Sequence, residues 1–305
     1  MVIKNRSGIC LLISASIIAI ALLLTVFGHG INLGIDFAGG LSMQYDLKAG
    51  ETVNRSAVDT ALSSIPAVGS YTVTVQGANN DKVNIRIKDV SKDDIQTVQE
   101  AFEKRIRTVY PDAETIGDVS YVGPVAGATL VKNAVISVLL ASLLMLIYIA
   151  IRFDLNSGLS AVFGLIHDVL IMLSFMVIFR SVIQMNSSFI AAALTIVGYS
   201  INNTIVIFDR IRENAKKMPA KPREEITNIS IRDSLGRTIC TTVTTLITIV
   251  ALCILGVASI REFALPIIVG ILSGVYSANM INGYVWAFLE EKALEYKQNK
   301  QSKKA

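Results

Sequence analysis

Charged residues are scarce in this chain. Asp, Glu, Lys and Arg together make up 17% of its 305 residues, whereas hydrophobic residues make up 52%. Soluble domains usually carry about 25% charged residues, so this shortage argues against an ordinary soluble protein. The mean hydropathy of +0.55 agrees. The composition therefore predicts an integral membrane protein.

Cysteine is also rare. The three cysteines, Cys10, Cys240 and Cys253, fall within or at the ends of apolar runs. The long polar segment between the first two runs contains none. Because disulfide frameworks occur in segments exposed to an oxidising compartment, no such framework is expected here.

Known catalytic motifs are missing as well. The sequence has no Walker loop, no HExxH and no CxxC. The stretch GYSIN at 198–202 lacks the second glycine of a nucleophile elbow and lies inside an apolar run. We expect a protein that is not an enzyme and that has no metal and no cofactor. Acidic residues interrupt the basic clusters and aromatics do not, so no nucleic acid is expected as a partner.

Six apolar stretches are each long enough to cross a bilayer, which takes roughly 20 residues. The predicted division is an N-terminus and first span at 1–29, spans at 129–152, 157–180, 187–209, 237–258 and 262–290, a cytoplasmic loop at 210–236 and a cytoplasmic tail at 291–305. Within the loop, Lys216 to Ser230 is either a surface loop or an interfacial helix. The first span begins with charges, as a signal peptide does. It is longer than a usual signal sequence and no clear cleavage site precedes Gly30, so we expect an uncleaved anchor.

The positions of Lys and Arg predict the orientation. They gather before the first span, after the second, in the loop at 210–236 and in the tail, which lie on one side if the spans alternate. Only Arg180 and Arg261 flank the short loops of the other side. Because basic residues stay in the cytoplasm, both termini are predicted to be cytoplasmic.

The segment 30–128 has a different pattern from the spans. Apolar residues alternate from Leu41 to Leu47, helical spacing follows at 53–64, and strands are predicted at 71–76 and 82–88. Ser91 is a predicted N-cap, with Asp94 three residues on, for a second helix, and a last strand is expected near 114–122. The order β-α-β-β-α-β is typical of a ferredoxin-like domain. The predicted fold is thus a membrane α-helical protein of six spans with one extracytoplasmic α+β domain after the first.

Asp168 lies inside the third span, beside His167. An ionised Asp at the centre of a spanning helix costs roughly 2.5 to 3.5 kcal/mol, so it must be neutral, paired or in contact with water. Two interpretations stay open: a buried polar contact that joins helices, or a carboxyl group that carries a proton. Arg237, at the start of the fifth span, either reaches the interface or serves as a countercharge for Asp168.

The last three spans carry further polar or small residues. Asn202 and Asn203 are adjacent in the fourth, where an amide can join helices or bind a cation but cannot carry a proton. Threonines at spacings of three and four follow Arg237 in the fifth and fit either helix packing or an ion path. In the sixth, Gly270 and Gly274, with Ser273 and Ser277, predict close helix packing.

Five segments together resemble the SecD/SecF family of bacterial protein-export membrane proteins, on its SecF side, which is related to resistance-nodulation-division transporters. In chain order they are GIDFAGG at 34–40, VGPVAG at 122–127, HDVLI at 167–171, GYSINNTIVIFDRIREN at 198–214 and the segment 234–245. Each is weak alone, but the ordered set is specific and covers nearly the whole chain.

The resemblance implies a subunit of the bacterial cytoplasmic (inner) membrane that acts with SecD, the SecYEG channel and, as a further partner, YajC on unfolded preproteins. A flow of H⁺ or Na⁺ would move the outside domains, which hold the emerging chain. The ion-coupling candidates are Asp168, Asn203, Arg237, Asn202 and His167, and the family motif of the outside domain is Gly34, Asp36, Gly39 and Gly40.

One residue departs from the family pattern. The second residue of the pair in the fourth span is usually aspartate (SINDT), whereas this chain has Asn203 (SINNT). Three explanations stay open: the chain relies on Asp168 or on SecD, it couples to another cation, or Asn203 is an engineered change that traps one state.

Two other functions also remain open. One is a small-molecule exporter of the resistance-nodulation-division type, although six spans without internal duplication argue against a self-sufficient pump. The other is a structural assembly factor of the Sec channel, in which Asp168 and Arg237 only hold helices together.

Overall fold

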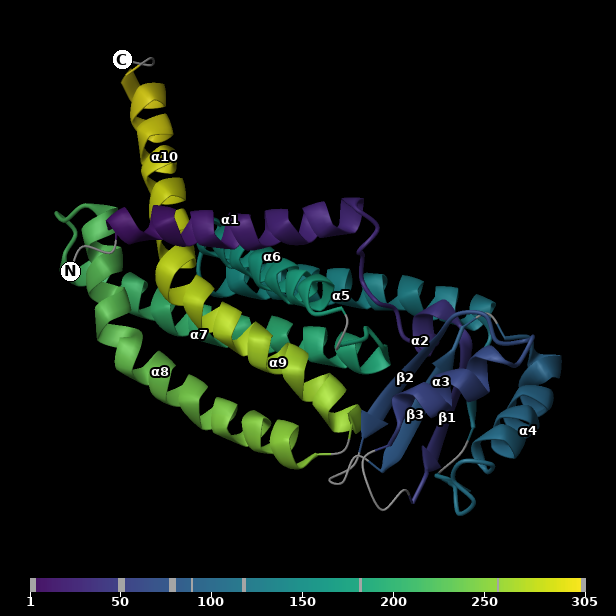
Figure 1. The fold of residues 1–305 in the computed structure, drawn as a ribbon. Helices are drawn as coiled ribbons and strands as arrows, with labels where there is room; N and C mark the ends of the chain where they lie inside the picture. The colour runs from purple at the N-terminus through teal and green to yellow at the C-terminus, as the bar shows by residue number, and fades with distance from the viewer. Residues whose placement is uncertain are drawn as a thin grey trace. The chain divides into compact units, whose positions relative to one another are not determined.

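The computed structural model describes residues 4–48, 53–76, 81–88, 90–116, 119–180, 183–256 and 258–302 (Figure 1). The chain forms two compact units. We call the first the helical unit; it comprises Met1–Asn32, Ile136–Ile183 and Ser188–Ala305. The second, the sheet unit, comprises Leu33–Val135 and Gln184–Ser187.

Long apolar helices make up the helical unit. They are α1 (Lys4–Val26), the end of α5 (Pro124–Arg152), α6 (Leu155–Ile178), α7 (Ser187–Lys217), α8 (Arg223–Leu255), α9 (Ala258–Ser277) and α10 (Gly283–Ser302). Among the described residues, six segments are long and apolar enough to cross a membrane: Ser7–Val26, Val125–Arg152, Leu155–Ile178, Ser187–Lys217, Arg223–Leu255 and Ile260–Ser302. The chain is thus a multi-pass membrane protein, as its composition predicted.

The helices differ in how far the unit covers them. About half of the α6 and α7 spans is buried, as is 61% of the last span, against 6% of α5 and 11% of α1 and α8. Helix α9 packs against α6 and α8, and α1 packs against α6. The interior of the unit therefore consists mainly of α6, α7 and α9, with buried polar residues also contributed by α1 and α8, such as Ser14 and Thr238.

The structure corrects three of the expected boundaries. The expected loop at 210–236 is much shorter: α7 continues to Lys217 and α8 begins at Arg223, so that 218–222 alone lies outside the helices. Its charges support helix, because Glu213 pairs with Arg210 at 2.8 Å and with Lys217 at 2.6 Å, at helical spacings. Helix α5 begins at Pro124 rather than 129, and the predicted tail is helical to Ser302.

The last span is also not one regular helix. A π-helical turn, Ala278–Asn282, lies between α9 and α10. Such turns are rare and are found mostly at functional sites. The hydropathy of the segment gives no sign of it.

The sheet unit contains an antiparallel sheet in the order β2-β3-β1-β4, with β5 also paired to β1. The strands are β1 (Gly40–Asp46), β2 (Tyr71–Gln76), β3 (Lys82–Ile87), β4 (Glu114–Thr115) and β5 (Ser120–Val122). Helices α3 (Arg55–Ser63) and α4 (Ile95–Ile106) pack against each other. This is the split βαβ arrangement that the strand and helix order predicted.

Every second residue of β1 points into the hydrophobic core of the sheet unit. Leu41, Met43 and Tyr45 are at most 1% exposed and pack with Phe102 and Ile106 of α4. Because strand residues point alternately to opposite faces, this spacing put the three on one face. The expected last strand is divided into β4 and β5, with 117–118 outside the described residues.

The N-terminus of α4 also differs from its expectation. Ser91 precedes a 3₁₀ turn (Lys92–Asp94), and its side chain makes no capping hydrogen bond. Because that turn comes first, Asp94 rather than Ser91 stands at the N-cap of α4. At α3, by contrast, the Asn54 side chain accepts a hydrogen bond from the Ser56 N–H at 3.0 Å.

Candidate functional site

Asp168 is fully buried in the helical unit. Its side chain leaves α6 toward α7 and α9, and its exposed fraction is 0%. Among the described residues it is the one buried carboxylate. A carboxylate so placed must have its oxygens satisfied by the protein, because leaving them unpaired is costly in a low-dielectric interior.

Three serine hydroxyls supply these hydrogen bonds. Ser200 of α7 donates to Oδ2 at 2.5 Å, and Ser277 of α9 donates to the same atom at 2.9 Å. Ser273, one turn before Ser277, donates to Oδ1 at 2.6 Å. Asp168 thus joins three helices through short contacts to neutral donors.

His167 completes the cluster. Its Nδ1 lies 3.0 Å from Asp168 Oδ1, and its Nε2 lies 2.8 Å from the Ser14 hydroxyl of α1. The ring also stacks on Tyr276 with the centroids 6.1 Å apart. The row Ser14–His167–Asp168 therefore connects α1 with the buried carboxylate. We call Asp168, His167, Ser14, Ser200, Ser273 and Ser277 the carboxylate cluster.

The cluster can hold its carboxyl group in either charge state. An ionised carboxylate only accepts hydrogen bonds, which suits the hydroxyls as donors. A protonated carboxyl group has one donor, and a serine hydroxyl turns to accept it without moving its oxygen. The same hydroxyls can therefore form hydrogen bonds with the carboxyl group in either charge state.

Small residues permit this close packing. Gly274 lies against α7, where an added Cβ would be 3.2 Å from Ser200 Cα. An added Cβ at Gly270 would overlap the Ile196 side chain. Both glycines, expected to serve helix packing, lie at the α7–α9 contact that brings Ser200 beside Ser273 and Ser277.

A second group of polar side chains lies next to the cluster. Asn282, the last residue of the π-helical turn, donates from Nδ2 to Thr204 of α7 at 2.9 Å. Its backbone carbonyl accepts from Ser160 of α6 at 2.5 Å, and its amide lies against Gly164. Its Oδ1 is buried and has no protein partner among the described residues. Buried orphan groups of this kind are usual sites for water or an ion.

The two asparagines of α7 face opposite ways. Asn203 is 2% exposed, and its Nδ2 has no partner in the described part of the chain. Asn202 is exposed. Of the two, Asn203 belongs to the interior that contains the carboxylate cluster, and Asn202 belongs to the outer surface of the bundle.

Arg237 does not neutralise Asp168. The arginine is exposed on α8, whereas Asp168 is covered, and no ion pair joins them among the described side chains. The side chains that contact Asp168 are the three serines and His167, whose Nδ1 lies 3.0 Å from Oδ1. Most of the threonine stripe after Arg237 bonds back to its own helix, as Thr241 does to the Arg237 carbonyl at 2.9 Å.

The GIDFAGG motif has a structural basis within the sheet unit. The Asp36 carboxylate accepts the Ser187 N–H at 2.8 Å, at the first residue of α7. Gly34 donates to the Met185 carbonyl at 2.7 Å, and Gly39 ends the short helix α2 (Ile35–Ala38) with φ +79°. Gly40 has φ +132°, and an added Cβ there would overlap the Ile87 carbonyl oxygen. These four residues therefore set backbone geometry rather than forming a reactive site.

Comparison with known proteins agrees with this architecture. Residues 101–292 match the family model described as protein export membrane protein SecD/SecF, C-terminal, and residues 25–50 match the SecD/SecF GG motif. The first covers more than half of the chain. Its description concerns protein export and not the export of small molecules.

Curated relatives match over most of the chain. Protein translocase subunit SecF of Rhodothermus marinus is 37% identical over 279 residues, which are 89% of this chain and 85% of that protein. The SecF subunit of Sebaldella termitidis is 36% identical over 92% of this chain and 90% of its own length. That of Rickettsia bellii is 35% identical over 87% and 85%.

Solved structures agree as well. SecDF of Thermus thermophilus, described as a translocon-associated membrane protein, has a TM-score of 0.76 at 32% identity over 94% of this chain. A SecDF in a super-membrane-facing form has a TM-score of 0.67 at 29% identity over 99%. This chain spans only 38% and 39% of those two longer proteins. By its family model, its relatives and its fold, the chain belongs to the SecD/SecF family of protein-export membrane proteins.

Proposed function

We propose that this chain is the SecF-type half of an ion-driven export motor. It acts with a SecD subunit and the SecYEG channel, with YajC as a further partner, in the late steps of preprotein export across the bacterial inner membrane. Family membership and the coverage of less than half of each SecDF structure support the need for a second half. The Lys and Arg bias supports a cytoplasmic location of both termini.

The outer surface of α7 and α8 supports a partner within the membrane. Asn202 and Arg237 are exposed at positions inside or at the end of spans. Beside them, Tyr199 of α7 donates to the Thr241 carbonyl of α8 at 3.3 Å. Polar groups at membrane depth normally face protein or water rather than lipid. A SecD subunit on this face would cover them.

The buried carboxylate is the observation that carries the proposal. Asp168 has no Lys or Arg partner in the described structure and is held by hydroxyls that suit both of its charge states. A purely structural contact has no need of an ionisable group at this depth. One elementary charge that moves through 100 mV releases about 2.3 kcal/mol, which is enough to shift a two-state equilibrium by more than tenfold.

Because position 203 holds an asparagine, Asp168 is the carboxylate available for ion coupling among the buried side chains of the described helices. An amide cannot take up a proton at neutral pH, so the interior of α7 supplies none of the titration that an aspartate at that position would allow. We infer that Asp168 is the coupling group of this subunit and that H⁺ or Na⁺ is the coupling ion.

Ion flux tests the assignment. The chain is reconstituted with SecD in liposomes, and H⁺ and Na⁺ uptake are followed under an imposed gradient. Asp168→Asn is expected to abolish the flux while assembly with SecD persists, because the amide keeps the shape but not the charge change. Asp209→Asn, on the exposed side of α7, is the matched control and should leave flux unchanged.

A structural role is the second candidate, since Asp168 bonds to both α7 and α9. If Asp168 has this structural role, Asp168→Asn would lower stability or assembly with SecD, and ion flux would continue in the complexes that still form. Asn203→Asp is the complementary change. A gain of proton-dependent flux would place a second carrier on α7, and no gain would favour Asp168 or a coupling ion other than H⁺.

A further inference from the structure

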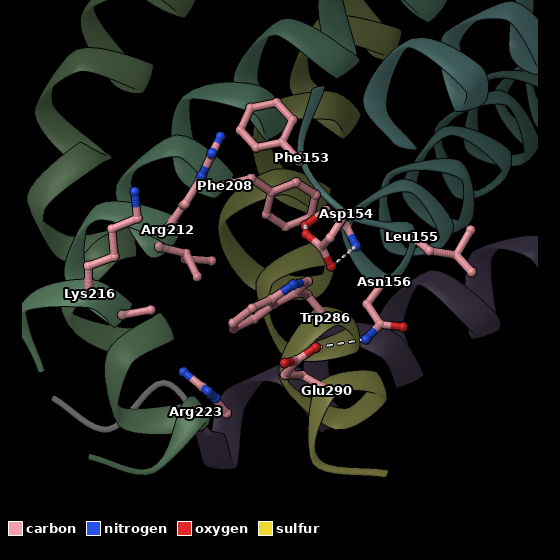
Figure 2. Close-up of a pocket in the computed structure, with 13 residues that line it drawn as sticks. Phe153, Asp154, Leu155, Asn156, Phe208, Arg212, Lys216, Arg223, Trp286 and Glu290 are labelled. Carbon is pink, nitrogen blue, oxygen red and sulfur yellow. Dashed lines mark hydrogen bonds between the residues drawn. The ribbon is translucent and has the colours of Figure 1, made fainter. Parts of the chain in front are cut away.

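A cavity lies at the end of the helical unit where α6 begins and α7 ends, away from the carboxylate cluster in sequence. Its volume is about 520 Å³, within the range of sites for small ligands. Figure 2 shows side chains from the α5–α6 junction, from the ends of α7 and α8, and from α10 around it.

Three cations line this cavity. Arg212 and Lys216 lie one helical turn apart on α7, and Arg223 is the first residue of α8. Arg212 donates to the Arg152 carbonyl at 3.4 Å, and none of the three forms an ion pair with a described carboxylate. With the three cations and the two carboxylates Asp154 and Glu290, the lining has a net charge of +1 (three minus two).

The two carboxylates of the lining are already engaged. Asp154 caps α6 by accepting from the N–H and the hydroxyl of Ser157. Glu290 accepts from Asn156 Nδ2 at 2.7 Å (Figure 2). Both are held by neutral donors, so they leave the arginines and the lysine available to an incoming anion.

The indole N–H of Trp286 independently indicates that the cavity holds a hydrogen-bond acceptor from a ligand. Its side chain is 7% exposed and lies against the cavity, and its indole Nε1–H has no hydrogen-bond partner among the described residues. Buried indole N–H groups usually find a partner. A ligand with acceptor oxygens in this cavity would supply it.

The surroundings of the cavity indicate the rest of the ligand. Phe153, Leu155 and Phe208 bring apolar surface to the lining. Leu155 and the nearby Ile151 are 64% and 81% exposed at the ends of their spans. The cavity thus combines cationic side chains with apolar side chains at the end of a membrane span. An anionic phospholipid has the complementary features, because its phosphate is negatively charged and its acyl chains are apolar.

We propose that this cavity binds a phosphate-bearing anion, supplied by the headgroup of an anionic phospholipid. Arg212, Lys216 and Arg223 hold the phosphate oxygens, Trp286 Nε1 donates to one of them, and the acyl chains pass along Ile151 and Leu155. The site fastens the ends of α6, α7 and α8 to one leaflet. This proposal does not depend on ion coupling through Asp168.

Trp286 makes the test direct, because it is the single tryptophan of the chain. The purified full-length chain in a neutral detergent is titrated with short-chain phosphatidylglycerol, and the indole emission is recorded. Short-chain phosphatidylcholine and inorganic phosphate are titrated in parallel. We expect a saturable change of emission with phosphatidylglycerol and none with the other two at equal concentration.

Charge variants complete the test. Replacing Lys216 and Arg223 together by glutamine is expected to weaken phosphatidylglycerol binding about 30-fold. Lys217→Gln is the matched control, because Lys217 pairs with Glu213 outside the cavity and its loss should leave the titration unchanged. Saturation by inorganic phosphate alone would overturn the lipid as the source. No saturable response to either anion, or an undiminished response in the double variant, would overturn the site.

Discussion

Gly164 is the residue at which the packing around the cluster is tightest. It lies one turn before Asp168 on α6, and a Cβ added there would overlap the Asn282 side-chain amide. A larger residue there would displace Asn282 from Thr204 and move the π-helical turn away from α6. Glycine is required at this position for close approach rather than for backbone freedom.

Gly164→Ala tests this contact. The added methyl group overlaps the Asn282 amide, so we expect a loss of about 1 to 3 kcal/mol in the free energy of unfolding, as for other overpacked cores. Gly198→Ala on α7 is the matched control, because no atom lies within 4 Å of its added Cβ. Thermal unfolding in detergent measures both. Equal midpoints for the two variants would contradict the close contact.

The sequence identified some members of the cluster and not others. Asp168, His167 and Asn203 were recognised as candidates because polar side chains at membrane depth are costly and therefore conspicuous. Ser273 and Ser277 were seen only as small residues for packing, and Ser14 and Ser200 were not singled out. A serine can satisfy itself on its own helix, so its partner depends on which helices meet.

At the scale of elements, the junction between α2 and β1 depends on Gly40. Its φ of +132° is open only to glycine, and an added Cβ overlaps the Ile87 carbonyl of the neighbouring strand β3. We expect Gly40→Ala to cost at least about 2 kcal/mol and to loosen the β1–β3 pairing. Faster amide hydrogen exchange along β1 and β3 in the full chain would show it. Gly69→Ala, in open space, should leave exchange unchanged.

Tyr45 of strand β1 makes the stability of the sheet unit depend on pH. Burial raises the pKa of the Tyr45 hydroxyl, and the nearby Glu103 carboxylate adds to this rise. A tyrosine in the unfolded chain ionises near pH 10. Folding keeps Tyr45 neutral above that pH, so the stability of the sheet unit falls by up to about 1.4 kcal/mol per pH unit as the pH rises further.

Tyr45→Phe should remove this part of the alkaline slope. Unfolding midpoints of the full chain at about pH 9 and about pH 11 measure it, since the two values lie on either side of the ordinary tyrosine pKa. Tyr296→Phe, at an exposed position, is the control and should keep the wild-type slope. A slope that Tyr45→Phe leaves intact would show that another group causes it.

The elements themselves were largely predictable. Length and hydropathy located six spans, and alternation from Leu41 to Leu47 located β1 within one residue. The π-helical turn was not predictable, because it depends on Asn282 meeting Gly164 and Thr204 from two other helices. Charge and proline in 210–236 leave loop and interfacial helix equally open, whereas the Arg and Glu spacing supports the helix that α7 and α8 form there.

At the scale of the whole molecule, the helical unit has a polar interior and a partly polar exterior. The interior contains Asp168 and Asn203, and the exterior presents Asn202 and Arg237. This division fits a subunit that carries its own coupling group and meets a partner through the face of α7 and α8. The sequence does not show which polar residues face the interior and which face the exterior. Asn202 and Asn203 are adjacent, and the packing of the helices alone determines that one is exposed and the other buried.

If Asp168 couples an ion gradient to export, its loss must uncouple preprotein release from that gradient. Inverted membrane vesicles that contain this chain, SecD and the SecYEG channel allow release of a late-stage preprotein to be timed with the gradient imposed or collapsed. We predict that the gradient accelerates release with the native chain and has no effect with Asp168→Asn. Equal acceleration by the gradient in both preparations would contradict the account.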